Sequence, residues 1–178
     1  MCIRDSYTFH LTGQYKASLH QQLSNFHAAL HTCFSVSEEQ KSPKSWSEAF
    51  RRLGQQIEKS KQKNKVIFID ELPWLDTPRS EFISALEHFW NGWAYHRDDI
   101  LLIVCGSATS WMIEKIINDH GGLHNRVTKR IRLLPFNLKE TEEFLKSKGG
   151  VYDRYQICLL YTSPSPRDAT LSRMPSSA

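Results

Sequence analysis

Several residue patterns are absent or sparse in this sequence of 178 residues. Its four cysteines, Cys2, Cys33, Cys105 and Cys158, include no C-x-x-C pair, which argues against a disulfide framework and a zinc ribbon. No apolar run approaches the roughly 18 residues of a membrane-spanning helix, and no signal-peptide-like stretch stands near residue 1. We therefore expect a cytoplasmic protein with no membrane partner.

The sequence also lacks a large excess of either sign of charge. The chain has 23 Lys and Arg against 19 Asp and Glu, a formal net charge of +4. That excess is too small and too dispersed to predict a nucleic-acid partner by itself. With 40% hydrophobic and 24% charged residues, the composition fits one globular domain with a substantial core.

The two ends of the chain differ in composition from a folded domain. Residues 159–178, LLYTSPSPRDATLSRMPSSA, hold three of the seven prolines and many Ser and Thr residues. This segment resembles a translated sequencing adapter, and MCIRDS at residues 1–6 resembles the same artefact; a natural Ser/Pro linker is the alternative. We expect both to be artefactual tails, which leaves residues 7–158 for fold reasoning.

The most informative stretch is KVIFIDELPWLD, residues 65–76. Its apolar residues 66–69 show no polar alternation, which predicts a strand covered on both faces of a parallel sheet. Asp70 and Glu71 follow at the carboxyl end, where ligands bind in open α/β sheets. Alternatively, the acidic pair marks only the point where a strand reaches solvent.

Two adjacent carboxylates at a strand end suit a nucleoside triphosphatase. One is needed to hold Mg²⁺ through its water shell, and a neighbour is needed to orient and deprotonate the attacking water. In this interpretation Asp70 holds the metal and Glu71 is the general base.

The apolar periodicity elsewhere predicts alternating strands and helices. We expect a strand at residues 7–11, helices at 18–32 and about 45–57, a long helix capped by Asp76 or Thr77, and a strand at 100–105. Residues 66–105 then form a parallel βαβ unit that places Asp70 and Ser107 at the same sheet edge. Ser107 could sense the γ-phosphate or the attacking water, or it could cap the next helix. Cys105 is expected in the core.

The segment after residue 120 is basic. Arg126, Lys129, Arg130 and Arg132 precede or overlap an expected short strand at 131–135, and a helix at 136–148 capped by Asn137 is expected to follow. Arg126 could reach a nucleotide, and solvated surface charge is the alternative. His27 with His31, and His120 with His124, have helical spacing but no carboxylate or C-x-x-C companion, so we expect no metal there.

Three segments in order, VIFIDELPWLDTPRSEFISALEHFWNGWA, LLIVCGSATSWMIEKI and NRVTKRIRLLPF, resemble the archaeal-type ATPase family, P-loop ATPases of the STAND and AAA+ kind. The resemblance covers roughly residues 7–158. It implies an α/β fold: a three-layer parallel-sheet P-loop core at 7–135 and the start of a helical lid at 136–158. By the same resemblance Asp70 and Glu71 are the Walker B pair, Ser107 stands at sensor 1, Arg126 is an arginine finger in cis or in trans, and the cofactors are ATP and Mg²⁺.

One departure from the family is large. A P-loop needs G-x-x-x-x-G-K-[ST], and none of the eight glycines here precedes a lysine. In the family this loop lies upstream of the strand expected at 7–11, so we expect a fragment that lacks it and is inactive alone. The parent is expected to be an ATPase. The alternative is a nucleotide-gated STAND-like switch or DNA-associated scaffold, with a DNA or protein partner bound through a missing C-terminal region, and with possible homo-oligomers. A degenerate interaction domain is disfavoured by the acidic pair.

Overall fold

The structure is a computed structural model that describes residues 7–34, 41–107, 109–118, 122–123 and 126–162. The chain divides into two compact units, residues 1–129 and 130–178. The first unit contains the sheet and the acidic pair. Residues 1–6 lie outside the described residues, as do residues 163–178 of the tail expected at 159–178; residues 159–162 of that expected tail are helical.

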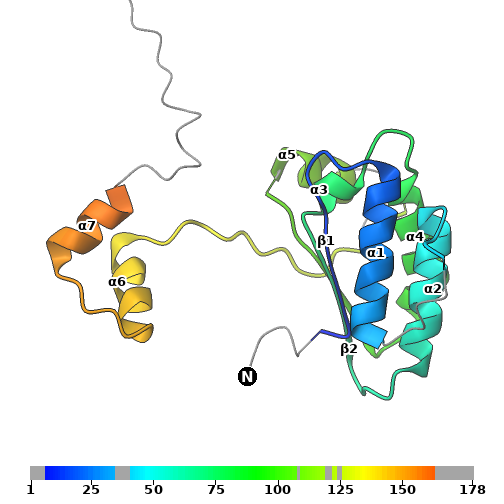
Figure 1. Cartoon of the computed structure of the whole chain (residues 1–178), viewed down its shortest axis with the longest axis horizontal. Helices are drawn as coiled ribbons and strands as arrows, with labels where there is room; N and C mark the ends of the chain where they lie inside the picture. The colour runs from blue at the N-terminus through cyan, green and yellow to red at the C-terminus, as the bar shows by residue number, and fades with distance from the viewer. Residues whose placement is uncertain (1–6, 35–40, 108, 119–121, 124–125, 163–178) are drawn as a thin grey trace, which may run out of the picture. The chain divides into compact units, whose positions relative to one another are not determined.

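Three parallel strands form the sheet of the first unit. They are β1 (Phe9–Thr12), β2 (Lys65–Asp70) and β3 (Ile100–Val104), in the spatial order β1-β2-β3 (Figure 1). In register, Leu11 lies beside Ile69, and Ile69 lies beside Val104. The strands expected at 7–11, 66–69 and 100–105 and the expected neighbour relation of β2 and β3 are confirmed.

Three helices cover one face of this sheet. Helix α1 (Leu19–Phe34) packs against α2 (Trp46–Lys59), and α2 packs against α4 (Phe82–Gly92), as Figure 1 shows. Ser45 caps α2, since its side chain accepts a hydrogen bond from the Glu48 amide. Aromatic residues fill the layer between helices and sheet; those buried there are Phe9, Phe26, Trp46, Phe50, Phe82 and Phe89. Burial of these rings is the main stabilising contribution to the unit.

The other face of the sheet is less covered than the uninterrupted apolar run predicts. Side chains alternate along β2: Ile67 and Ile69 are fully buried, whereas Phe68 is only half-buried. On β3, Leu101 is 54% exposed and Ile103 is 37% exposed. Within the described residues the first unit therefore has one helical layer on its sheet, so the expected third layer is not present in this part of the chain.

The connections to the sheet differ from the prediction in one place. Helix α3 (Leu72–Leu75) directly follows the acidic pair, and α4 begins only at Phe82. Asp76 and Thr77 are therefore not its cap; the residue before α4 is Glu81, whose φ of 55° is left-handed, as is that of Arg79 at 61°. Short turns complete the unit: η2 (Ala94–His96), α5 (Thr109–Met112) and the π-helical η3 (Ile113–Ile117).

Within its described residues, 130–162, the second unit contains two helices, α6 (Leu138–Ser147) and α7 (Arg154–Thr162), that pack on each other. Asn137 caps α6 in a reciprocal capping box with Glu140, as its position before the acidic first turn predicts. The expected strand at 131–135 is wrong: these residues pair with no described strand, and Leu133 is 89% exposed. A strand needs a neighbour to bond its amides and carbonyls, and no strand among the described residues pairs with this segment.

Candidate functional site

The acidic pair stands where β2 ends, at the carboxyl edge of the parallel sheet. Asp70 is the last residue of β2, and Thr12 at the end of β1 is its register partner. Glu71 follows with φ 49° and ψ 48°, a left-handed conformation that is uncommon for a residue with a side chain. Such a conformation costs on the order of 1 kcal/mol or more and is found preferentially at functional positions. The turn redirects the Glu71 side chain out of the strand.

Ser107 holds the Glu71 carboxylate from the next strand. Its hydroxyl lies 3.0 Å from Glu71 Oε2, and its backbone amide donates to the same oxygen at 3.3 Å. Ser107 comes three residues after the end of β3, the strand next to β2. The structure therefore brings together Asp70, Glu71 and Ser107, which the sequence placed at one sheet edge.

Cys105 is a contact that sequence reasoning missed. Its Sγ lies 2.7 Å from Asp70 Oδ1, and the same oxygen accepts the Glu71 amide at 2.9 Å. Burial, together with the hydrogen bond to Asp70, raises the pKa of the Cys105 thiol to about 11, so the thiol is protonated at neutral pH and can donate. The missed signal is the strand register. Val104 pairs with Ile69, so the residues that follow them, Cys105 and Asp70, lie opposite each other.

The backbone around the pair is held by close packing. The Gly13 amide donates to the Asp70 carbonyl at 2.8 Å, and a Cβ on Gly13 would collide with the Glu71 carbonyl oxygen. Gln22, fully buried on α1, donates to the carbonyls of Gln14 and Trp74. The Gln22 side chain therefore connects the loop after β1 with α3. Both segments pack beside Glu71, and both are held to α1 by this residue.

Arg126 lies elsewhere in the first unit. Its guanidinium stacks on the Tyr95 ring at 4.1 Å, on the turn η2 that precedes β3. Tyr95 lies near the amino ends of the parallel strands, whereas the acidic pair lies at their carboxyl ends. A five-residue strand separates these two ends by roughly 15 Å. Among the described residues the structure does not bring Arg126 to Asp70 or Glu71, and its expected role as an arginine finger stays a prediction.

A further acidic residue near the site is Asp76, just after α3. Burial raises the pKa of its carboxyl, while the Lys115 charge and a hydrogen bond with Trp111 act in the opposite direction. Asp76 therefore links the segment after the acidic pair to the helical turns that follow Ser107.

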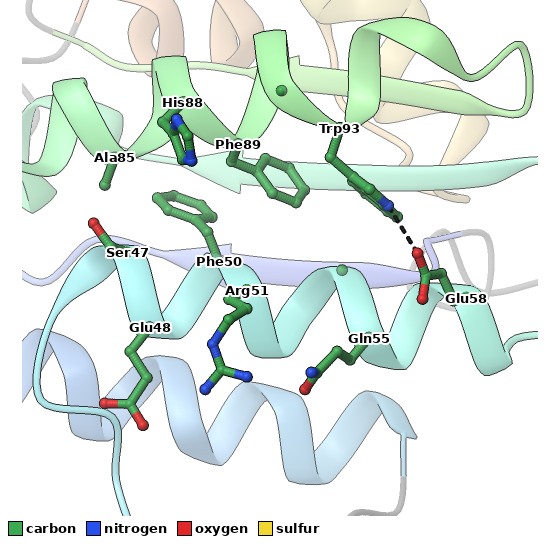
Figure 2. Close-up of a pocket in the computed structure, with 12 residues that line it drawn as sticks. Ser47, Glu48, Phe50, Arg51, Gln55, Glu58, Ala85, His88, Phe89 and Trp93 are labelled. Atoms are coloured by element: carbon green, nitrogen blue, oxygen red, sulfur yellow. Dashed lines mark hydrogen bonds between the residues drawn. The ribbon is translucent and has the colours of Figure 1, made fainter.

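A cavity of about 760 Å³ lies on the helical layer, between α2 and α4 (Figure 2). Phe50, Phe89 and Trp93 contribute its aromatic side chains, and the Trp93 indole donates to Glu58 at 2.9 Å. Gly54 and Gly92 leave space on the two helices. None of the sequence-predicted site residues lines this cavity.

The donor set at the sheet edge fits Mg²⁺ only in combination with other ligands. In the described part of the chain, no three His, Cys, Asp or Glu residues group so that they could hold a metal ion. Asp70 and Glu71 supply carboxylate oxygens, which a hard cation prefers. Magnesium usually keeps several waters and takes one or two carboxylates plus phosphate oxygens, and the pair matches that pattern. Among the described residues, no helix is long and apolar enough to cross a membrane.

Comparison with known proteins supports the fold only. No family model matches the chain, and no curated protein matches it. Among solved structures it is similar to a Walker-type ATPase of Pyrococcus abyssi, with a TM-score of 0.57 and 16% identity over 87% of this chain and 51% of that chain. The chain has a fold like that of a Walker-type ATPase. The chain spans about half the length of that protein, and its first unit has a mixed α/β architecture with a three-stranded parallel sheet.

Proposed function

We propose that this chain carries the hydrolytic half of an ATPase site, with Asp70 and Glu71 as its Walker B pair. The observation that carries the proposal is the hydrogen bonding of Glu71 to Ser107, which lies just after the adjacent strand β3, beside Asp70 at the carboxyl edge of a parallel sheet. That edge is where open α/β sheets bind ligands. The likeness to a Walker-type ATPase fold supports the same assignment.

Each residue then has a role set by its place. Asp70 would hold the water shell of Mg²⁺, and when bound the metal supplies charge neutralisation for the phosphates. Glu71 would accept the proton of the attacking water, and Ser107, at the sensor-1 position, would orient Glu71. Arg126 would act on a neighbouring site in trans, because the structure places it on Tyr95 within its own unit. That role implies a homo-oligomer.

A second candidate function is a nucleotide-gated switch of the STAND-like kind, with a DNA or protein partner. The two hydrogen bonds from Ser107 to Glu71 Oε2 are compatible with this function as well, because they can hold Glu71 in place without any proton transfer. In this alternative hydrolysis is slow and only resets the state.

The proposal is tested by ATP turnover, measured with and without DNA, of a protein that contains this chain together with the expected upstream G-x-x-x-x-G-K-[ST] loop, here called the complete protein. An ATPase hydrolyses ATP steadily in Mg²⁺, whereas a switch binds ATP with little turnover until a partner is added. The 178-residue chain is the control. It has no G-x-x-x-x-G-K-[ST] loop, and its two carboxylates repel an unaccompanied triphosphate, so we expect no tight ATP binding. Micromolar binding by this chain in calorimetry would show that nucleotide recognition does not depend on such a loop.

A further inference from the structure

Two backbone hydrogen bonds hold Cys105, one to the residue before the acidic pair and one to the residue after it. Its amide donates to the Ile69 carbonyl at 3.0 Å, and its carbonyl accepts from the Leu72 amide at 2.9 Å. Residues 69 and 72 bracket Asp70 and Glu71. The position of Cys105 relative to the pair is therefore set by strand pairing and by the start of α3, and does not depend on a mobile side chain.

The two oxygens of Asp70 have different surroundings. Oδ1 accepts from the Cys105 thiol at 2.7 Å and from the Glu71 amide at 2.9 Å. Within the described part of the chain, Oδ2 has no hydrogen-bond partner. Two donors on one oxygen fix the rotation of a carboxylate, so the other oxygen is presented in one direction. Groups that orient a metal ligand in this way typically change metal affinity about 10- to 100-fold when they are removed.

We propose that Cys105 is a positioning residue for Asp70: its thiol, together with the Glu71 amide, holds Oδ1 so that Oδ2 faces the water shell of Mg²⁺. This inference rests on the proposed ATPase function. It assigns to Cys105 a role different from core packing, which the apolar run ILLIVC predicts. A space-filling role and a positioning role differ in one respect, because only the second requires a hydrogen-bond donor.

Substitutions at Cys105 separate donor from volume. Cys105→Ser keeps a donor in a smaller side chain, Cys105→Val has similar bulk without a donor, and Cys105→Ala removes both. A matched control is Cys33→Ala, because Cys33 is an exposed free cysteine on α1. Melting temperatures of all variants report packing and identify any variant that does not fold.

The experiment uses the complete protein with Glu71→Gln, which prevents turnover and keeps the backbone amide that bonds Asp70. Binding of a fluorescent ATP analogue is titrated with Mg²⁺. We expect the Mg²⁺ midpoint to rise about tenfold in Cys105→Val and Cys105→Ala, to stay within about threefold in Cys105→Ser, and not to move in Cys33→Ala. Binding without Mg²⁺ should be equal in all variants.

Two results would overturn the inference in distinguishable ways. If nucleotide binds with a clear Mg²⁺ dependence and Cys105→Val keeps the parental midpoint, Cys105 fills space and the ATPase proposal stands. If the protein with native Cys105 shows no Mg²⁺-dependent nucleotide binding, the proposed function and the inference fail together.

Discussion

The Ser107 hydroxyl lies 3.0 Å from Glu71 Oε2, and the Ser107 amide donates to the same oxygen. The segments that follow the neighbouring strands β2 and β3 thus contribute one carboxylate and its two donors, at the edge of the sheet where β2 ends with Asp70. The contact connects the end of β2, the proposed Walker B strand, with the segment that follows its neighbour β3.

Ser107→Ala in the complete protein tests what this contact does. If the hydroxyl orients Glu71 for proton transfer, its loss should lower ATP turnover about tenfold while ATP affinity changes little, because positioning acts on the chemical step. Steady-state hydrolysis and equilibrium binding give the two quantities. A rise in turnover would contradict the orienting role and favour the switch, in which Ser107 restrains the base.

The left-handed backbone at Glu71 predicts an effect on stability in the 178-residue chain itself. Alanine at this φ of 49° carries a steric cost that glycine does not, and both substitutions remove the carboxylate that bonds Ser107. Glu71→Gly should therefore be more stable than Glu71→Ala by about 1 kcal/mol in urea unfolding. Equal stabilities would mean that residue 71 does not keep this conformation in solution.

An ion-pair cluster at the start of β2 predicts a pH dependence. Asp99 accepts from Lys65 at 2.6 Å and from Arg97 at 2.9 Å, and these hydrogen bonds, that from Arg97 first, hold the pKa of Asp99 well below its usual range. A carboxyl with a lowered folded-state pKa stabilises the fold above its unfolded pKa of about 3.9, and this contribution is lost as pH falls further. Asp99→Asn should lower the melting temperature at pH 7.

The difference between Asp99→Asn and the unsubstituted chain should then shrink as the pH falls below about 4. The matched control is Asp98→Asn, because Asp98 is exposed and has no ion pair among the described residues. A pH-independent effect of Asp99→Asn would show that packing, and not the charge of Asp99, accounts for the loss.

Gly54 gives a prediction of the opposite sign. It lies inside α2, where glycine is less stable than alanine by roughly 0.5–1 kcal/mol, and a Cβ there would meet Trp93 at an ordinary 3.7 Å. Gly54→Ala should stabilise the chain by about that amount and narrow the cavity between α2 and α4. Gly106→Ala is the contrasting variant, because its Cβ would lie 2.6 Å from Pro73 Cδ, and it should destabilise. If both substitutions destabilised, the helical packing around Gly54 would be tighter than described.

The pairing of β2 with β3 and the meeting of Asp70, Glu71 and Ser107 were predictable, because two apolar runs of strand length end in polar residues at a common edge. Local features that depend on tertiary packing were not. Within the apolar run Cys105 is indistinguishable from a core residue, and its contact with Asp70 follows only from the strand register. The helix expected after Asp76 begins later, because Arg79 and Glu81 take left-handed conformations that no propensity indicates. The run at 131–135 has strand composition, but no strand in the described part of the chain pairs with it.

Glu71→Gln in the complete protein tests the central claim most directly, with ATP binding and single-turnover hydrolysis measured side by side. Glutamine keeps the shape and hydrogen bonding of glutamate and removes the proton acceptor. We expect ATP affinity within a few-fold of the unsubstituted protein and turnover lower by roughly two or more orders of magnitude. Asp70→Asn should instead also weaken Mg²⁺-dependent binding. Hydrolysis by Glu71→Gln at the unsubstituted rate would contradict the assignment of Glu71 as the base and of this sheet edge as a hydrolytic site.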